Sequence, residues 1–252
     1  MTASGIYVYG IVGRSHPLSA GAAGVGEPPA PVRLLPVDDL AVVVSAAYPG
    51  LRARRRDLMA HQGLLMTLAE AGPVLPMRFG MVAPDEATVL AGVAARHSEH
   101  AAVLERLDSR VEMNIKITPV QDNLAALIRE DPVVRRIREE TRRHPSYEAN
   151  VRLGEAVAAG LRRRAAAVAA RLPAEFAGIA GIGGIADDMR PGPDVEGCVL
   201  NVSFLVPRRE EGRFRGVAER FAADHRDRLE LRVTGPLPCY SFVAPEPVPA
   251  RA

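Results

Sequence analysis

One stretch decides the fold of the second half of this chain: Val111-Glu112-Met113-Asn114-Ile115-Lys116-Ile117-Thr118. Apolar and polar residues alternate along all eight positions, which predicts a strand with one buried and one solvent-facing side. The apolar residues are expected to face the core, and the polar set that begins with Glu112 is expected to face water. A strand of this kind belongs to a sheet that is covered on one face only.

The elements that follow this strand have a recognisable order. The pattern predicts a strand at 111–118, a helix at 146–172, a weak strand at 184–189, a strand at 198–206, a helix at 210–226 and a strand at 229–233. This β-α-β-β-α-β order is that of a ferredoxin-like fold. A charged helical insertion near 121–143 interrupts it and is expected to break at Asp131-Pro132, where Asp can cap and Pro fits a first turn.

The first half also mixes strands and helices. Its pattern predicts a strand buried on both faces at 6–12, a mobile loop at 13–31, strands at 32–35 and 40–46, a helix at 51–71, an extended piece at 74–80 and a helix from Pro84 to Leu107. We therefore expect an α+β protein of two domains, 1–108 and 109–252. The C-terminal domain is the ferredoxin-like one, and segment 234–243 is expected to pack back on the N-terminal domain.

Composition narrows the class of protein. The chain has 252 residues and a formal charge of 32 − 30 = +2, which argues against a dedicated nucleic-acid binder. Lys116 is the single lysine, and we attribute the excess of arginine to codon usage. Two cysteines, Cys198 and Cys239, are too few for a disulfide scaffold. With no targeting segment and no apolar run long enough to span a bilayer, we expect a cytoplasmic protein without a membrane partner.

No catalytic or metal-binding constellation stands out. His97 and His100 share a helix but lack a third ligand, so we interpret them as helix-face residues rather than a metal site. His61 lies on an apolar stripe and is interpreted as a core histidine. Gly181-Ile182-Gly183-Gly184 lacks the setting of a phosphate-binding loop and is interpreted as a flexible connection. We expect neither enzymatic activity nor a bound cofactor or metal.

Two proline-containing strips are better candidates for function. Leu75-Pro76-Met77-Arg78-Phe79-Gly80 and the residues from Gly235 to Val243 have a shape fixed by proline but cannot occupy a central sheet position. They are either structural turns or a docking surface for a protein. As a docking surface, their candidate partner-binding residues are Arg78, Phe79, Leu237, Tyr240, Phe242 and Val243. The arginine clusters on the predicted helices are either solvated faces or contacts for an acidic partner.

These strips also carry a family resemblance. The opening YVYGIV at 7–12, LPMRFG at 75–80, VEM at 111–113 and TGPLPCYSFV at 234–243 occur in the order found in the gas vesicle protein F/L family, GvpF/GvpL, which the chain resembles from about residue 6 to 243. Cys239 stands where a second proline is expected. The resemblance agrees with a fold of two α+β domains, the C-terminal one a modified ferredoxin-like fold, and it does not distinguish F from L.

The resemblance implies a non-enzymatic accessory protein of gas vesicle formation without cofactor residues. It implies binding to the hydrophobic shell subunit GvpA and to other accessory Gvp proteins early in assembly, in the cytoplasm and in association with the gas vesicle. Expected surfaces are the open face of the C-terminal sheet, the insertion 121–143 and the strip 237–243. The alternatives are a ferredoxin-like regulatory module that binds a small ligand or a nucleic acid and, third, an enzyme that uses the 181–184 loop.

Overall fold

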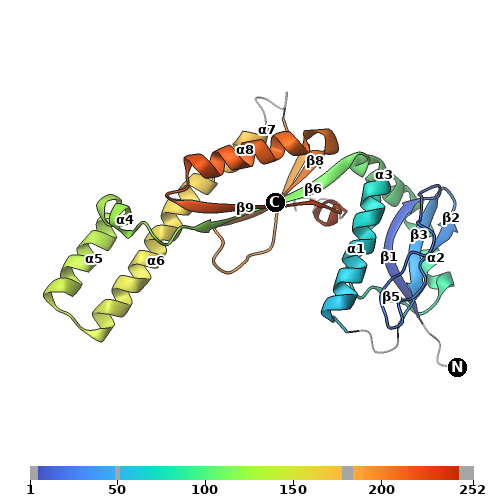
Figure 1. Ribbon diagram of the computed structural model, residues 1–252, viewed down its shortest axis with the longest axis horizontal. Coiled ribbons are helices and arrows are strands. Elements are labelled where there is room, and N and C mark those ends of the chain that lie inside the picture. The colour runs from blue at the N-terminus through green and yellow to red at the C-terminus, as the bar shows by residue number, and fades with distance from the viewer. Residues whose placement is uncertain (1–4, 49–51, 178–183, 244–252) are drawn as a thin grey trace, which may run out of the picture. The chain divides into compact units, whose positions relative to one another are not determined.

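The computed structural model describes residues 5–48, 52–177 and 184–243 (Figure 1). These residues form two compact units. The first contains the chain up to Glu112 together with the residues from Pro236 onward, and the second is Met113–Gly235. Each unit combines helices with a sheet that contains antiparallel strand pairs. The mixed α and β character predicted from the sequence is confirmed.

The first unit is a sheet with helices packed against it. Its elements are β1 (Ile6–Gly13), β2 (Arg33–Val37), β3 (Leu40–Ala46), α1 (Arg55–Ala71), β4 (Val74–Pro76), β5 (Val82–Ala83), α2 (Glu86–Ala95), α3 (His97–Leu107) and the short η2 (Tyr240–Phe242). The strand order is β2-β3-β1-β4, with β5 also paired to β1. Seven of the eight residues of β1 are buried, which confirms a strand covered on both faces.

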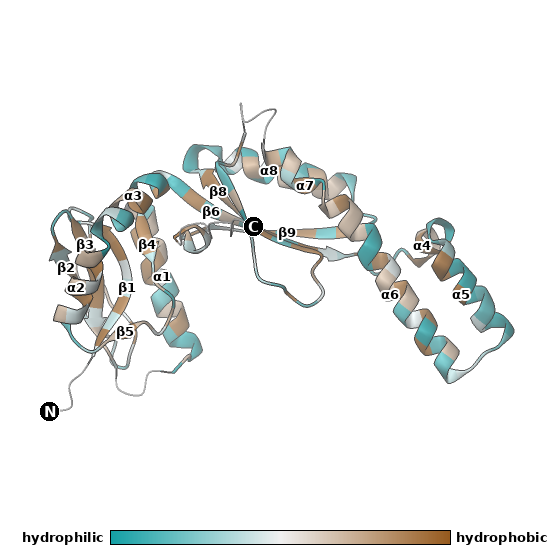
Figure 2. Ribbon diagram, turned by 180° about the vertical axis from the view of Figure 1, so that it is seen from behind, coloured by the Kyte–Doolittle hydropathy of each residue, from teal (hydrophilic) through white to brown (hydrophobic). Residues whose placement is uncertain are grey.

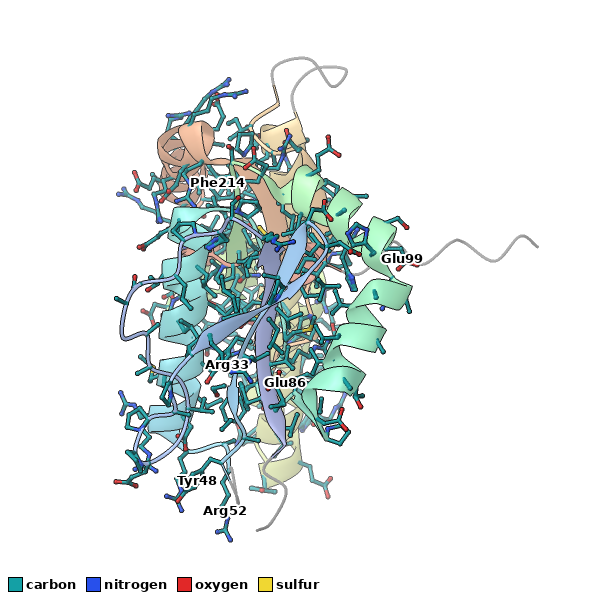
Figure 3. The ribbon with its side chains drawn as sticks, turned by 90° about the vertical axis from the view of Figure 1, so that its right-hand side faces the viewer. Arg33, Tyr48, Arg52, Glu86, Glu99 and Phe214 are labelled. Atoms are coloured by element: carbon teal, nitrogen blue, oxygen red, sulfur yellow. The ribbon has the colours of Figure 1, made fainter. Side chains whose placement is uncertain are left out.

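The helix predicted from Pro84 to Leu107 is two helices. Asp85 caps the first by accepting a hydrogen bond from the Thr88 N–H at 2.7 Å, and Arg96, with φ −121° and ψ 25°, separates α2 from α3. The break lets α2 pack on β2 while α3 packs on β1 and β4. Arg33 of β2 forms an ion pair with Glu86 in the first turn of α2 (Figure 3).

The long segment between β1 and β2 was predicted to be a mobile loop, but its middle is held by hydrogen bonds to β1 and α1. Val25 is fully buried, and its N–H donates to the Tyr9 hydroxyl at 2.9 Å. The Gly26 N–H donates to the buried Asp57 carboxylate of α1 at 3.2 Å. These contacts fix the middle of the segment, whereas its glycine and proline content predicts only that it is a loop.

The second unit is a sheet with α7 and α8 together on one face (Figure 1). Its elements are β6 (Arg110–Pro119), which begins in the first unit, α4 (Leu124–Glu130), α5 (Pro132–Arg143), α6 (Tyr147–Ala169), α7 (Leu172–Ala177), β7 (Asp188–Pro191), β8 (Leu200–Pro207), η1 (Arg208–Glu210), α8 (Glu211–Asp224) and β9 (Leu229–Leu237). The strand order is β7-β8-β6-β9. Under the helices, the Phe176, Phe204 and Phe214 rings lie within 4.3–5.3 Å of one another and centre the core.

Three elements of this unit differ from the sequence prediction. Helix α6 ends at Ala169, and Pro173 lies in the first turn of α7, where its missing N–H is tolerated. The weak strand predicted at 184–189 is β7, Asp188–Pro191. Strand β9 runs on to Leu237 through Pro236, which an edge strand accepts because its N–H groups need no ladder partner.

The predicted insertion is α4 and α5, which pack against α6. The break at Asp131-Pro132 is confirmed, because Asp131 accepts from the N–H groups of Val133 and Val134 and Pro132 opens α5. Leu127, Val134 and Leu161 form the shared apolar cluster. Gly160 permits the close approach, since a Cβ there would lie 3.0 Å from Leu127 Cδ1.

Candidate partner-binding site

The strips that carry the family resemblance come together in the first unit around His61 of α1. Strand β1 contributes Tyr7 and Tyr9, the connection after β4 contributes Met77 and Phe79, and η2 contributes Tyr240. His61 is 3% exposed, so the histidine expected in the core lies there. Residues more than 170 positions apart in the sequence are therefore neighbours.

A chain of hydrogen bonds fixes this histidine. Its Nε2 lies 3.1 Å from the Met77 carbonyl oxygen, which accepts only, so the proton is on Nε2. Nδ1 then accepts from the Tyr7 hydroxyl at 2.9 Å, and that hydroxyl accepts from the Gly80 N–H at 3.1 Å. Both ring nitrogens are thus satisfied, and the main chain of the LPMRFG strip is held at two points.

Aromatic rings surround the imidazole. The Tyr9 ring stacks on it at 5.7 Å, and the Phe79 ring meets it edge-on at 5.7 Å. The Tyr240 hydroxyl lies 3.4 Å from Nε2, and its side chain packs against the same core cluster as Phe79. Phe79 and Tyr240 thus flank His61, each half-buried, at the edge of the core.

The electrostatics of this network favour structure over catalysis. Burial lowers the pKa of His61, which keeps the ring neutral near pH 7. Burial raises the pKa of Tyr7 to about 12, against the lowering effect of the Gly80 N–H. Burial, helped by the Glu112 charge, also raises the pKa of Tyr240 to about 12. With pKa values of about 12, the Tyr7 and Tyr240 hydroxyls are poorly suited to general acid or base catalysis near neutral pH.

The C-terminal strip is fixed by a carboxylate that the sequence pattern assigned to solvent. Glu112 is 5% exposed and accepts from the Ser241 N–H at 2.8 Å and from the Ser241 hydroxyl at 2.7 Å. The Arg106 guanidinium donates to the Phe242 carbonyl oxygen. The interpretation of Glu112 as a solvent-facing residue is therefore wrong, because its partner comes from the other end of the chain.

The six candidate partner-binding residues differ in burial. Phe242 is fully buried and packs in the core, so its side chain is not presented to a partner in this structure. Leu237, Tyr240, Val243 and Phe79 are half-buried, and Arg78 is exposed. Partner binding by the residues that reach the surface stays a prediction.

Two apolar side chains missed by the sequence analysis extend this surface. Met81 is 48% exposed and Val82 is 47% exposed, directly after the Arg78–Gly80 turn. The Met81 carbonyl oxygen accepts from the Val8 N–H at 2.9 Å, so this segment is fixed to β1. We call Arg78, Phe79, Met81, Val82 and Tyr240 the turn surface.

The open face of the second sheet, one of the expected partner surfaces, carries polar side chains, and partner binding by this face stays a prediction. Along β9, Glu230, Arg232 and Thr234 are exposed. On β6 the Asn114 amide donates to Asn201 Oδ1 at 3.0 Å. The aromatic residue Phe204 of β8 is 1% exposed and packs in the core, so it is not presented for base stacking, which is how RNA-binding sheets of this kind recognise bases.

In the described part of the chain, the side chains of the other candidate sites are paired with groups of the protein itself. A shallow cavity of about 500 Å³ lies between α4, α5 and α6, but its arginines are paired, Arg163 with Asp131 at 2.6 Å and Arg164 with Asp227 at 2.8 Å. His97 pairs with Asp39. Within residues 5–48, 52–177 and 184–243 no group of three metal-ligating side chains converges. Gly181–Gly183 of the glycine-rich loop lie outside the described residues.

A search for membrane-spanning helices gave a negative result. Among the helices of the described residues, none combines the length and the apolar composition needed to cross a membrane.

Comparisons with known proteins give one consistent result. The family model described as gas vesicle synthesis protein GvpL/GvpF matches residues 5–244. Gas vesicle protein F of Streptomyces sp. (strain CB03234) is 40% identical over 242 residues, covering 94% of this chain and 98% of the relative. Gas vesicle protein L of the same strain is 31% identical over 245 residues, covering 89% and 87%. The crystal structure of GvpF from Anabaena sp. PCC7120 matches with a TM-score of 0.75 at 23% identity, covering 96% of this chain and 99% of that one, which supports the fold alone. The chain belongs to the GvpL/GvpF family of gas vesicle synthesis proteins.

Proposed function

We propose that this protein is a non-catalytic accessory factor of gas vesicle formation, which binds the hydrophobic shell subunit GvpA and other Gvp proteins during assembly. Membership of the GvpL/GvpF family supports the role in vesicle formation. Its place of action would be the cytoplasm, at the forming vesicle.

The observation that carries the proposal is that the LPMRFG strip and the C-terminal strip meet at His61. Two sequence strips from distant parts of the chain meet there, and each presents a half-buried aromatic ring, Phe79 and Tyr240, at the same place. Met81 and Val82 add exposed apolar area next to them. Apolar side chains gathered at the surface of a folded protein mark contacts with partners.

The hydrogen bonds around this surface would also limit the conformational entropy lost when it binds a partner. The main chain of the strip is fixed by the Met77 and Gly80 hydrogen bonds, and the C-terminal strip by Glu112. A surface that is rigid before binding loses little conformational freedom on association. An apolar shell subunit would aggregate in water, and a rigid apolar surface can cover part of it until it joins the shell.

We also propose the finer description of the fold: two α+β domains near the boundaries 1–108 and 109–252, the second a modified ferredoxin-like domain with α4 and α5 as its insertion. The strand order β7-β8-β6-β9 supports this, since it is the order expected for β-α-β-β-α-β units in one sheet. The unit boundary at Glu112 lies close to the domain boundary.

Co-purification of the full-length protein with the shell subunit tests the proposal. We expect Met81→Asp to lower the amount of shell subunit recovered at least tenfold, because a carboxylate would have to be desolvated in an apolar contact. Met59→Asp is the matched control, since Met59 is a methionine of α1 that is 59% exposed and outside the turn surface.

Recovery of the shell subunit with Met59→Asp but not with Met81→Asp would support the turn surface. Equal recovery with both variants would exclude that surface while leaving shell-subunit binding in place. Failure of the wild-type protein to bind the shell subunit would refute the proposed partner itself.

A further inference from the structure

Strand β9 is a long edge strand without the features that usually protect a sheet edge. An edge strand presents unpaired main-chain groups, and proteins commonly limit pairing there with short strands or proline. The strands at the other three ends of the two sheet orders, β2, β4 and β7, have five, three and four residues, and each contains a proline. Strand β9 has nine residues, and its residues 229–234 include neither proline nor glycine. This part of β9 is therefore suited to pairing with a further strand.

Hydrogen bonds at the start of β9 show which of its main-chain groups face the sheet. The Arg228 carbonyl oxygen accepts from the Val120 N–H at 3.2 Å, directly after β6, so it points towards β6. The next N–H group, that of Leu229, points the other way and donates to the His225 carbonyl oxygen at 3.1 Å. Main-chain groups alternate in direction along a strand. Even-numbered residues of β9 thus face β6, and odd-numbered residues face the free edge.

The far end of the strand agrees with this alternation. The carbonyl oxygen of Gly235, an odd-numbered residue, accepts from the Arg215 guanidinium of α8 instead of from β6. Between the two ends, Leu231 and Val233 therefore point their N–H and C=O groups towards the free edge. In the described sheet β9 is paired with β6 and ends the strand order, so these groups lie where a further strand would add.

The side chains along this edge are apolar on one face and charged on the other. Leu231 and Val233 lie on the same face as Leu229, which is 2% exposed, but they are only half-buried. Glu230 and Arg232 lie on the opposite face and are exposed. Figure 2 shows this mixture of hydrophobic and hydrophilic residues along β9. A strand added at the edge would bury the remaining apolar area of Leu231 and Val233.

The charges of the open face need a partner that the described residues do not supply. Arg228 and Val120 are bonded, so Arg232, four residues later on β9, lies opposite Lys116, four residues earlier on β6. Two cations opposite each other on adjacent strands are destabilising. Within the described part of the chain neither Arg232 nor Lys116 forms an ion pair, and neither does Glu230. A carboxylate beside Arg232 on the free edge would offset this repulsion.

A second copy of β9 supplies that carboxylate. When two copies pair antiparallel about a two-fold axis at Leu231, each Glu230 lies opposite Arg232 of the second copy, and each Leu229 lies opposite Val233 of the second copy. The two Leu231 residues exchange N–H and C=O bonds, and each Val233 N–H reaches the Leu229 carbonyl oxygen of the second copy. The Leu229 N–H, already bonded to His225, is not needed. The free groups, the apolar margin and the charges therefore match in one arrangement.

The charges also reject the neighbouring registers. A two-fold axis at Glu230 would place two carboxylates opposite each other, and an axis at Arg232 would place two guanidinium groups opposite each other. Like charges directly opposite across two strands are destabilising. The self-complementary pair of Glu230 and Arg232 thus favours both the second copy as occupant and the register centred on Leu231.

We propose that β9 pairs with β9 of a second copy of this chain, antiparallel and centred on Leu231, so that the protein forms a homodimer with one continuous sheet through both second units. The two-fold axis repeats every contact, as in any isologous dimer. Main-chain bonds and apolar burial stabilise the dimer, and the ion pairs set its register, because exposed ion pairs contribute little stability by themselves. This proposal goes beyond the proposed function and does not depend on shell-subunit binding.

Sedimentation velocity of the full-length protein alone, over a range of concentrations, tests the proposal. The wild type should dimerise reversibly. Glu230→Arg and Arg232→Glu should each weaken self-association at least tenfold, because like charges then meet at both ends of the contact. An equimolar mixture of these two variants should dimerise as the wild type does, since every arginine then faces a glutamate. Glu219→Arg, an equal charge change at an exposed position of α8, is the control and should leave the dimer unchanged.

A main-chain variant tests the edge itself. Leu231→Pro removes an N–H group that faces the second copy and should weaken the dimer at least tenfold, whereas an outward-facing position of an edge strand accepts proline in the monomer. Circular dichroism checks that each variant is folded. A wild type that stays monomeric at all concentrations overturns the proposal, even if β9 then pairs with a strand of another protein. A mixture of the two charge variants that stays monomeric also overturns it.

Discussion

At the scale of single residues, His61 makes the stability of the first unit depend on pH. Burial lowers its folded-state pKa below the unfolded value of about 6.5. Between those two pKa values the unfolded chain binds more protons than the folded chain, so the free energy of unfolding rises with pH in this range. The stabilisation from neutral His61 is therefore lost as the pH falls from 7 towards 5.

The measurement is urea unfolding at several pH values from 5 to 7.5, for the wild type and for His61→Gln. We expect the wild type to show a steeper loss of stability below pH 6.5 than the variant. His144→Gln, at an exposed position, is the control and should keep the wild-type slope. Parallel curves for wild type and His61→Gln would contradict the role given to His61.

The Tyr7 hydroxyl is the second residue-scale test. Tyr7→Phe removes both the donor to His61 Nδ1 and the acceptor of the Gly80 N–H. Since groups left without partners in the core are destabilising, we expect a loss of about 1–3 kcal/mol in the free energy of unfolding. Tyr48→Phe removes a hydroxyl from a 38% exposed side chain and should change stability by less than about 0.5 kcal/mol. Equal effects would contradict the network.

Sequence reasoning placed His61 in the core but missed the groups that hold it. Helical periodicity identifies a buried position, whereas the partners Tyr7, Met77 and Tyr240 come from three other parts of the chain. Glu112 shows the same limit, because alternation along a strand is local and its partner Ser241 is 129 residues away. Among the candidate residues, the sequence did not show that Phe242 is fully buried whereas its apolar neighbours Tyr240 and Val243 in the same strip are half-buried.

At the scale of elements, the approach of α6 to α4 and α5 depends on Gly160. Gly160→Leu should destabilise the protein by about 1–3 kcal/mol or more, because its side chain would be forced against Leu127 and Val134. Gly92→Leu on α2, where a Cβ meets nothing within 4 Å, should be neutral or stabilising. Thermal unfolding of both variants checks this, and a Gly160→Leu variant as stable as wild type would refute the close packing.

Elements marked by local signals were predicted well, and those set by tertiary packing were not. The cap and proline at Asp131-Pro132 predict the start of α5. The α2–α3 break has no such signal, because Arg96 is compatible with a helix and the break follows from packing on two parts of the sheet. Strand β9 continues through Gly235, whose φ of 145° suits glycine, since an edge position tolerates both glycine and proline there.

At the scale of the whole molecule, the C-terminal strip completes the first unit. A chain that ends at Gly235 loses the Ser241 bonds to Glu112 and the buried Phe242 ring. Amide hydrogen exchange in β1 and α1 should then become much faster, corresponding to a loss of at least about 3 kcal/mol. Phe214→Ala, in the core of the second unit, should instead affect α8 and β8. Equal acceleration in both units by either change would contradict this assignment.

Hydrogen exchange of the full-length protein, alone and with purified shell subunit, tests the central claim most directly. If the turn surface binds the shell subunit, protection should increase in residues 77–82 and 239–243 and stay unchanged along β7 and β8. Protection confined to the second unit, or no change at a shell-subunit concentration at which the two proteins co-purify, would contradict the account.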